Sequence, residues 1–288
     1  MEPLSLTLIL LSGVLHSIWN YFAKKSIDKF TFAWWMKICE FIIYIPIGLP
    51  LFIREAIPST GWFIILISGI IHFGYWWLLS AAYTHGDLSV VYPIARSAPL
   101  YVLIVTIVFL NESLSIIGII GIIMVVSGVY SLSTEAFQVR RLLNPFSTLR
   151  DSGIIYAFLT ALSVTAYSLV DAQGAKYFNP MFYVWMENAI STIPFSILIL
   201  WRKRQRIRLE WQNSKWFIIL AGLLGPLSYA IIVFTMKTYQ VSYVVSLRQV
   251  SVVISVLLGG TLLKEEGLKT RLLSSLIIFC GLFAIGST

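Results

Sequence analysis

Charged residues are scarce in this sequence, since Asp, Glu, Lys and Arg together make up 12% of its 288 residues. A soluble domain carries about 25% charged residues, because its surface must face water. With 58% hydrophobic residues and a mean hydropathy of +0.85, the chain cannot cover a water-soluble globule with charge. We therefore expect its apolar side chains to face lipid.

Motifs for metals, nucleophiles and nucleotides are absent as well. The sequence has no H-E-x-x-H, G-x-S-x-G or Walker pattern, and its histidines have no partner at metal-ligand spacing. Cys39 and Cys280 both fall inside apolar runs, so they say nothing about the redox compartment. We expect no metal, no cofactor and no direct use of ATP.

A net charge of +8 raises the question of nucleic acid as a partner. The basic residues, however, lie in short segments between apolar runs, where cytoplasmic loops place them, so we expect none. The N-terminal run has no basic n-region and is too long for a signal-peptide core, so we interpret it as the first helix. The expected partners are a small-molecule substrate and the lipid bilayer.

Ten apolar stretches approach the length of about 20 residues that a membrane-spanning helix needs. They are Pro3–Phe22, Thr31–Ile53, Gly61–Tyr83, Leu88–Leu110, Leu114–Leu132, Gly153–Gln173, Met181–Trp201, Trp216–Met236, Val241–Leu263 and Leu272–Ser287. The longest connections, Ser133–Ser152 and Arg202–Lys215, leave no room for a soluble domain. The sequence thus predicts an all-α integral membrane protein whose chemistry takes place within the helices.

Lysine and arginine are distributed unevenly between the two sides of this arrangement. The loops after the first, fifth, seventh and ninth helices hold 15 of the 21 basic residues, and the opposite loops hold Arg54, Lys176 and Lys237. Because basic loops stay in the cytoplasm, both termini are predicted outside it, in a multi-pass protein of the inner or plasma membrane.

The chain also repeats itself at an offset of about 150 residues. Trp35-Met36-Lys37 matches Trp185-Met186-Glu187, Tyr75 falls opposite Tyr229, and Arg96 aligns with Arg248 and Glu112 with Glu265. We predict a first repeat over 1–132, a cytoplasmic connection over 133–152 and a second repeat over 153–288. A five-helix unit crosses the membrane an odd number of times, so the second copy is inverted, as in many secondary transporters.

Several stretches resemble the EamA-type branch of the drug/metabolite transporter superfamily. They are His16-Ser17-Ile18-Trp19-Asn20 with Lys24-Lys25, AAYTHGDLSVVYPIARSAP ending at Asn111-Glu112, and AYSLVDAQGAK. The resemblance implies ten helices around a central cavity. It also implies a protein that moves small metabolites, often amino acids, out of the cell. The ninth helix departs from the pattern, with Ser246 and Ser251 where the fourth has Pro93 and Pro99.

Arg96 and Arg248 are the main candidates for binding substrate. Ionisable groups inside a membrane cost free energy, so their presence there indicates a functional role. Each lies near the midplane, Arg96 roughly 12 Å and Arg248 roughly 10 Å deep at 1.5 Å per residue. We expect at least one to grip a carboxylate or phosphate through its planar fork, with Arg96 favoured by its flanking prolines. The alternative is that each ties helices together through Glu40, Asp171 or Glu187.

Three buried carboxylates are candidates for proton coupling. Glu187 is the first choice, since it has no basic neighbour in its own helix, whereas Glu40 has Lys37 one turn away. Asp171 lies toward the outer end of the sixth helix, which suits a gate or helix tie as well.

Polar and aromatic residues complete the predicted site. His16, His72, Tyr75, Trp76 and Tyr92 are expected to contact substrate, with core or lipid packing as the alternative for each aromatic. Trp19 and Asn20 share a face with His16 and are predicted to act as a gate or helix tie. Gly118, Gly121 and Gly128 predict close helix packing, within the chain or at a homodimer contact.

These observations favour a secondary transporter, in the export direction, of a small amino acid-like or anionic metabolite, working by alternating access. Two other classes stay open. One is an intramembrane lipid-modifying enzyme that uses His16, His72 and an adjacent carboxylate. The other is a membrane receptor or assembly factor that transports nothing.

Overall fold

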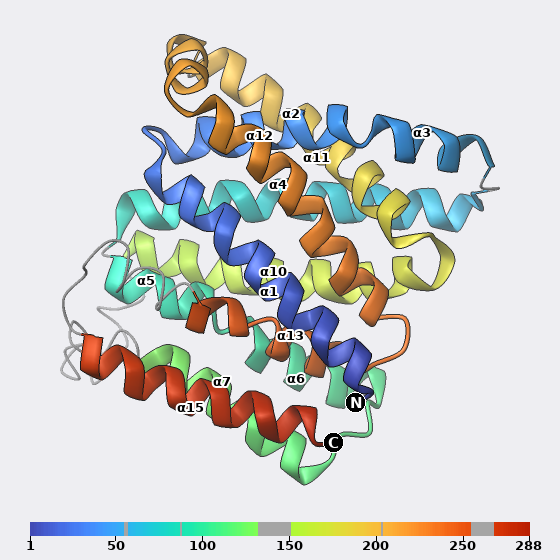
Figure 1. The fold of residues 1–288 in the computed structure, drawn as a ribbon, viewed down its shortest axis with the longest axis vertical. Coiled ribbons are helices and arrows are strands. Elements are labelled where there is room, and N and C mark those ends of the chain that lie inside the picture. Colours follow the sequence, from blue (N-terminus) through green and yellow to red (C-terminus); the bar gives the residue numbers. More distant parts are fainter. Residues whose placement is uncertain (55–56, 87, 132–150, 203, 255–267) are drawn as a thin grey trace.

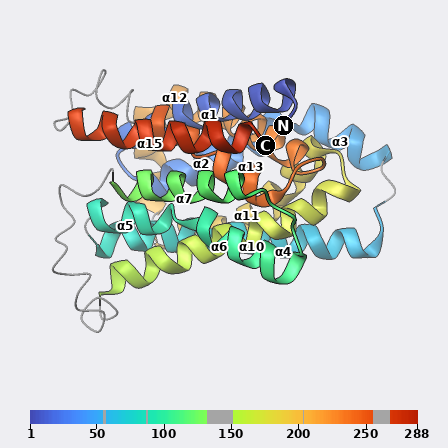
Figure 2. The same ribbon diagram turned by 90° about the horizontal axis from the view of Figure 1, so that it is seen from below.

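The computed structural model describes residues 1–288 except for 55–56, 87, 132–150, 203 and 255–267. The described residues form helices and no strand. In both views the helices run in roughly the same direction, between two opposite ends of the molecule (Figure 1, Figure 2). Most of the predicted connection 133–152 and the second half of the ninth predicted helix, with Glu265, lie outside the described residues.

The helices follow the predicted order. The first half contains α1 (Pro3–Lys25), α2 (Lys29–Ile43), α3 (Ile45–Arg54), α4 (Ser59–His85), α5 (Leu88–Ala95), α6 (Ala98–Leu110) and α7 (Ile116–Ser131). The second half contains α10 (Ser152–Tyr177), α11 (Pro180–Arg202), α12 (Arg204–Thr235), α13 (Val241–Leu247) and α15 (Leu268–Gly286).

The described helices lie at the ten positions predicted for membrane spans. Five of them (α1, α4, α10, α11 and α12) are each long and apolar enough to cross a membrane, and α2 with α3 makes a sixth span that is bent by 59°. Four shorter apolar helices, α6, α7, Val241–Ile254 and Leu273–Gly286, take the remaining positions. The protein is thus a multi-pass, all-α membrane protein, as the sequence predicted.

Local signals explain several helix ends. The Asp28 carboxylate accepts from the backbone N–H of Thr31 (2.8 Å) and begins α2, and Asp151 accepts from that of Gly153 (2.9 Å) and begins α10. Such bonds satisfy backbone donors that the first turn of a helix leaves free. Asn111 adopts a left-handed conformation (φ 51°) and ends α6. Asn is one of the few residues apart from Gly that enter this conformation readily.

The connection predicted over Arg202–Lys215 is wrong as a loop, because α12 already begins at Arg204. This stretch contains neither Gly nor Pro, and its charges, which argue against a membrane span, do not oppose helix formation in water. Its inner face is used: the Glu210 carboxylate accepts from the Asp28 N–H (2.8 Å), and the Ile207 carbonyl accepts from the Trp35 indole (3.0 Å). The helix therefore extends beyond the apolar segment and packs against the start of α2.

Helix pairing reveals the internal symmetry. The duplication equates α1 with α10, α2–α3 with α11, α4 with α12, α5–α6 with α13, and α7 with α15. Helix α4 packs on α10, and their equivalents α12 and α1 pack on each other in the same way. The pairs α12·α2 and α4·α11 are likewise exchanged, while α7·α15 and α6·α13 map onto themselves. The two five-helix repeats are therefore related by a pseudo-two-fold axis, with the second inverted.

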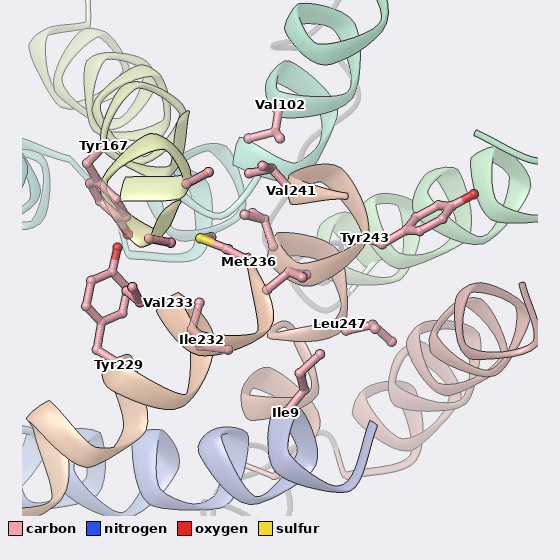
Figure 3. Close-up of a cluster of buried hydrophobic side chains, with 14 of the residues drawn as sticks. Ile9, Val102, Tyr167, Tyr229, Ile232, Val233, Met236, Val241, Tyr243 and Leu247 are labelled. Carbon is pink, nitrogen blue, oxygen red and sulfur yellow. The ribbon is translucent and has the colours of Figure 1, made fainter. Parts of the chain in front are cut away.

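The core lies where the repeats meet. Figure 3 shows Ile9 of α1, Val102 of α6 and Leu247 of α13 around the side chains of α12, and these three are essentially buried. The outer surface is also apolar, since Phe109 and Ile116 are exposed by 73% and 77%. Such exposure requires lipid around the protein, so the helices associate by close packing rather than by escape from water.

The predicted glycine stripe provides this packing within the chain. A Cβ added to Gly121 would lie 2.8 Å from the carbonyl oxygen of Gly281 in α15, and one added to Gly128 would lie 2.9 Å from the Ile278 nitrogen. Gly118 faces the Tyr243 ring. The stripe is therefore covered by α13 and α15 and does not supply a dimer contact.

Candidate functional site

Arg96 and Arg248 both lie at breaks between helices. Arg96 and Ser97 separate α5 from α6, and Arg248 directly follows α13, whose span resumes and continues to Ile254. At the second break the Gln249 N–H donates to the Ser246 carbonyl (3.0 Å), a tightened turn that forms without proline. Discontinuous helices in corresponding positions of two inverted repeats mark the binding site in many transporters.

A hollow lies between these two breaks. Its walls come from both repeats: α1, α4, α5 and α6 of the first, and α10 and the α13 span of the second. The residues that line it are His16, Tyr75, Leu79, Ala95, Arg96, Ala98, Thr160, Val164, Tyr167, Ser168, Val245, Arg248 and Gln249. Its free volume is about 40 Å³, room for a few water molecules and less than a small-molecule site needs, so the hollow is narrow in this structure.

The lining is cationic and incompletely paired. The Arg248 guanidinium lies 4.9 Å from the centre of the Tyr229 ring, and its Nη2 lies 3.5 Å from His16 Nδ1. The Arg96 guanidinium lies 5.5 Å from the centre of the Tyr92 ring. Nε2 of His16 and Oε1 of Gln249 are buried without a hydrogen-bond partner. Arginines on aromatic faces keep their N–H donors available for a ligand.

Within the part of the chain that the structure describes, no carboxylate forms an ion pair with either arginine. The alternative in which the arginines tie helices through Glu40, Asp171 or Glu187 therefore has no contact to support it. Asp171 and Glu187 lie in a second polar cluster, which Tyr167 and Tyr229 separate from the hollow, and Glu40 lies beside it.

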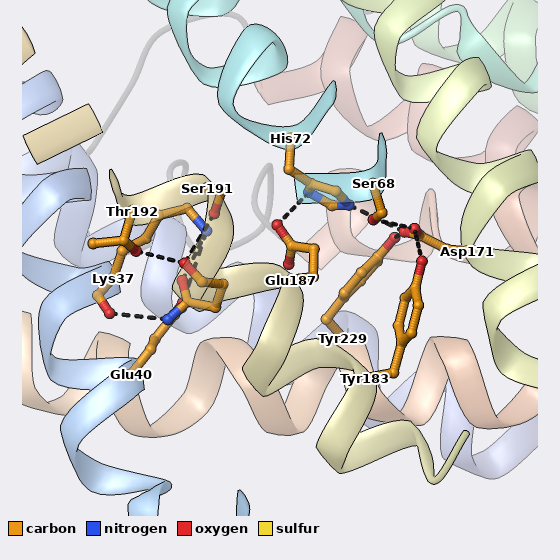
Figure 4. Close-up of polar contacts among 11 residues, drawn as sticks. Lys37, Glu40, Ser68, His72, Asp171, Tyr183, Glu187, Ser191, Thr192 and Tyr229 are labelled. Carbon is orange, nitrogen blue, oxygen red and sulfur yellow. Dashed lines mark hydrogen bonds and ion pairs between the residues drawn. The ribbon is translucent and has the colours of Figure 1, made fainter. Parts of the chain in front are cut away.

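Asp171 is the centre of this cluster and is fully buried. Its Oδ1 accepts from the hydroxyls of Ser68 (2.6 Å) and Tyr183 (2.7 Å), and its Oδ2 accepts from the Tyr229 hydroxyl and lies 3.0 Å from His72 Nε2 (Figure 4). Four groups on three helices, α4, α11 and α12, thus occupy the acceptor positions of one carboxylate, the full capacity of an ionised carboxyl group.

His72 joins Asp171 to Glu187. On the far side of the ring, Nδ1 lies 3.6 Å from Oε1 of Glu187, an oxygen that is buried without a hydrogen bond (Figure 4). The face of the His72 ring stacks on Tyr167, with centroids 4.1 Å apart. His72 thus has a carboxylate at each ring nitrogen, which brings three titratable side chains together inside the membrane region.

Lys37 and Glu40 lie beside this cluster. The Lys37 ammonium donates to the Asn188 side chain (3.0 Å) and lies 4.0 Å from Glu40, three residues along the same helix. The Asn188 amide donates back to the Lys37 carbonyl (3.0 Å), which ties α2 to α11. Lys37 therefore neutralises Glu40 locally, the arrangement that its spacing indicated.

The other predicted residues are divided between the hollow and the core. His16, Tyr75, Arg96 and Arg248 line the hollow and Tyr92 lies under Arg96, whereas His72 and Trp76 lie outside it. Trp19 is buried between His16 and Trp76, edge-on to the His16 ring at 4.8 Å. Asn20 donates to the His16 carbonyl of its own helix (2.7 Å), and the described residues give its amide no bond to another helix.

Sequence reasoning missed Tyr167, Gln249 and Tyr183. Tyr167 lines the hollow and stacks on His72. In the sequence, however, nothing distinguishes it from the other 13 tyrosines. Gln249 directly follows Arg248, and its position beside a charged residue in an apolar run was the one signal that could have identified it.

Ten spans in two inverted repeats, with broken helices that meet at a polar hollow, define an inverted-repeat membrane transporter. The model of the EamA-like transporter family matches residues 3–134 and 151–287, and the chain belongs to this family. It is therefore a transporter of the drug/metabolite type.

A solved structure described as "Crystal structure of protein" has the same fold. It is 18% identical in sequence, superposes with a TM-score of 0.76, and the match covers 99% of this chain and 98% of that one. No curated protein matches the sequence.

Proposed function

We propose that this transporter carries a small anionic metabolite with two negative charges, and that Arg96 and Arg248 hold it between the repeats. The observation that carries the proposal is the pair of arginines at equivalent helix breaks, in one hollow, with no carboxylate paired to either in the described residues. Two guanidinium groups without counter-ions form a site for a dicarboxylate or a phosphate ester.

The same hollow disfavours a zwitterionic amino acid. An α-ammonium group needs a carboxylate or several carbonyl oxygens, and no Asp or Glu is among the residues that line the hollow. Two nearby guanidinium groups would also repel it. The N-terminal end of α6 begins at Ala98 on the wall of the hollow, and a helix N-terminus favours an anion further.

Transport follows from the position of the site. The hollow is built from both repeats, so a rocking of one repeat against the other exposes it to one side and then the other. We assign to the cytoplasm the end that carries Lys25, Arg204 and Lys215, because of its excess of basic residues. Export is the direction that resemblance to the family suggests.

The enzyme alternative finds little support in the geometry. His16 lines the hollow, whereas His72 lies in the Asp171 cluster, so the two histidines do not share a site. Ser68 donates to Asp171 rather than to His72, so it is not an activated nucleophile.

The test is flux into liposomes that contain the purified protein, with radiolabelled succinate, inorganic phosphate, glutamate and leucine as probes. We expect succinate or phosphate to enter faster than leucine, and this entry to be lost in the Arg96→Gln, Arg248→Gln double variant. Leucine entry that exceeds both dianions would overturn the proposed charge class. Conversion of the vesicle lipids, followed by chromatography, would favour the enzyme instead.

A further inference from the structure

The His72–Glu187 contact holds two features of a proton site. The ring has one carboxylate at each nitrogen, Asp171 at 3.0 Å and Glu187 at 3.6 Å. Oε1 of Glu187 is buried and has no hydrogen-bond donor, although the side chain is aimed at the ring (Figure 4). A buried, unpaired carboxylate oxygen costs free energy unless a proton is supplied to it.

The hydrogen bonds of Asp171 indicate that this proton lies between His72 Nδ1 and Glu187 Oε1. Asp171 already receives three hydroxyl donors, and the Nε2–H of His72 is the fourth, which fixes the ring with its Nδ1 toward Glu187. With one further proton, Nδ1 and Oε1 share it, and the contact is attractive. Without it, the Nδ1 lone pair faces an ionised carboxylate, and the contact is repulsive.

The surroundings leave this proton as the variable charge. Against His72 lie Asp171 and Tyr167 on α10, Glu187 on α11 and Tyr229 on α12. The charged groups beyond them are Arg248, which lies on the Tyr229 ring, and Lys37 with Glu40 on α2. Helix α5 also packs on α4, and its Tyr92 contacts Arg96 instead. Among the described residues, no group of three His, Cys, Asp or Glu could hold a metal ion. The two carboxylates lie on opposite edges of the ring, which suits a proton rather than a cation between them.

We propose that His72 and Glu187 form a single proton-binding site, and that its protonation is coupled to anion binding at Arg248. This inference rests on the proposed function for the coupled ligand, but not for the proton site. The link is Tyr229, whose hydroxyl donates to Asp171 while its ring lies 4.9 Å from the Arg248 guanidinium. Tyr167 provides a second link, since it stacks on His72 and lines the hollow.

The site also joins the repeats. His72 and Ser68 belong to the first repeat, and Asp171, Tyr183, Glu187 and Tyr229 belong to the second. The proton therefore stabilises this arrangement of the two repeats, and its loss loosens the contact that a rocking movement must break. One anion and one proton moving together would follow.

The proton site can be tested without any substrate, by infrared spectroscopy of the full-length protein in lipid between about pH 5 and pH 8, the interval in which histidine sites titrate. In a Glu40→Gln background, which removes the other buried glutamate of this region, we expect a protonated-carboxyl band that weakens as the pH rises and that is lost when Glu187→Gln is added. If Glu187→Gln does not fold, His72→Gln replaces it. A Glu40→Gln protein without a titrating band, or a band that persists when Glu187→Gln or His72→Gln is added and the protein folds, would overturn the proton site.

The coupling has its own test. Arg248→Gln imitates the arrival of an anion, because it neutralises the guanidinium, so the carboxyl band at a fixed pH should become stronger. This gain should shrink in a Tyr229→Phe background and persist in Tyr183→Phe, which also removes one hydroxyl from Asp171 but does not touch Arg248. Equal gains in the two backgrounds would refute the role of Tyr229.

Flux measurements then separate the two proposals. Succinate or phosphate entry in the wild type should fall as the pH rises, by up to about tenfold per pH unit, if one proton must be bound for each anion that moves. In Glu187→Gln the entry should keep only the pH dependence that comes from the titration of succinate or phosphate itself. Entry that depends on the arginines but never on pH would sink the coupling and leave the proposed function intact. A titrating carboxyl band without dianion entry would do the reverse.

Discussion

Arg96 and Arg248 occupy the same position in the two repeats: each is the first residue after a short helix that points into the membrane, Ala95 ending α5 and Leu247 ending α13. Because the repeats are inverted, the two guanidinium groups approach one hollow from opposite sides of the bilayer. In the proposed site, contact with the substrate is therefore shared between the two repeats.

This relationship predicts that both arginines contribute to binding. Arg96→Gln and Arg248→Gln should each weaken binding of a dianion roughly tenfold to hundredfold, since a hydrogen bond to a charged group contributes about 1.5–3 kcal/mol. Competition against labelled succinate or phosphate in liposomes measures the effect. Arg54→Gln, at an exposed position at the end of α3, is the control and should bind as the wild type does. A full effect from one arginine and none from the other would contradict a shared site.

We predict that Glu112 helps to position Arg248, because it caps the helix that Arg248 follows. Its carboxylate accepts from the Val241 N–H (2.8 Å) and the Ser242 hydroxyl (2.6 Å), so a residue of the first repeat caps the first turn of α13. Glu112→Ala should lower the free energy of unfolding by about 1 kcal/mol, the usual cost of a lost cap, and should reduce transport as well. Denaturation in detergent gives the stability, with the exposed Glu2→Ala as reference. Wild-type stability in Glu112→Ala would show that the cap is dispensable.

Helices α7 and α15 pack so closely that we expect one methyl group added at their contact to destabilise the protein. Gly121→Ala would place a Cβ 2.8 Å from the Gly281 carbonyl, and overpacking of this kind costs about 1–3 kcal/mol. Gly74→Ala in α4 is the matched substitution, because nothing lies within 4 Å of its added Cβ, and it should not destabilise. Thermal unfolding of the two variants side by side decides the matter. Equal stability would mean that α7 and α15 can separate without cost.

The topology predicts which ends of the helices face the cytoplasm. In a background without the native thiols (Cys39→Ala, Cys280→Ser), Lys25→Cys and Lys215→Cys should be protected from a membrane-impermeant thiol reagent added to intact cells. Lys237→Cys, at the opposite end, should react. Opposite labelling of Lys25→Cys and Lys215→Cys would contradict the inverted repeat itself.

The sequence allowed prediction of what depends on local composition. Apolar length located the spans, and the shared order of Trp35-Met36-Lys37 and Trp185-Met186-Glu187 revealed the duplication. The pairing of His72 with Asp171 and Glu187 could not be predicted, because the three come from different helices and their facing depends on helix rotation. The extent of α12 could not be predicted for a different reason. The charges of Arg202–Lys215 indicate that this segment leaves the lipid, but they do not indicate whether the helix ends there.

The four donors to Asp171 have a consequence for how such a protein is made. Two of them, Ser68 and His72, belong to the first repeat, and the other two belong to the second. The second repeat by itself therefore fills only half of the acceptor positions of this carboxylate, and α4 of the first repeat fills the rest. Asp171 is thus fully hydrogen-bonded only when the two repeats are packed together, so correct burial of this carboxylate depends on both halves of the chain being in place.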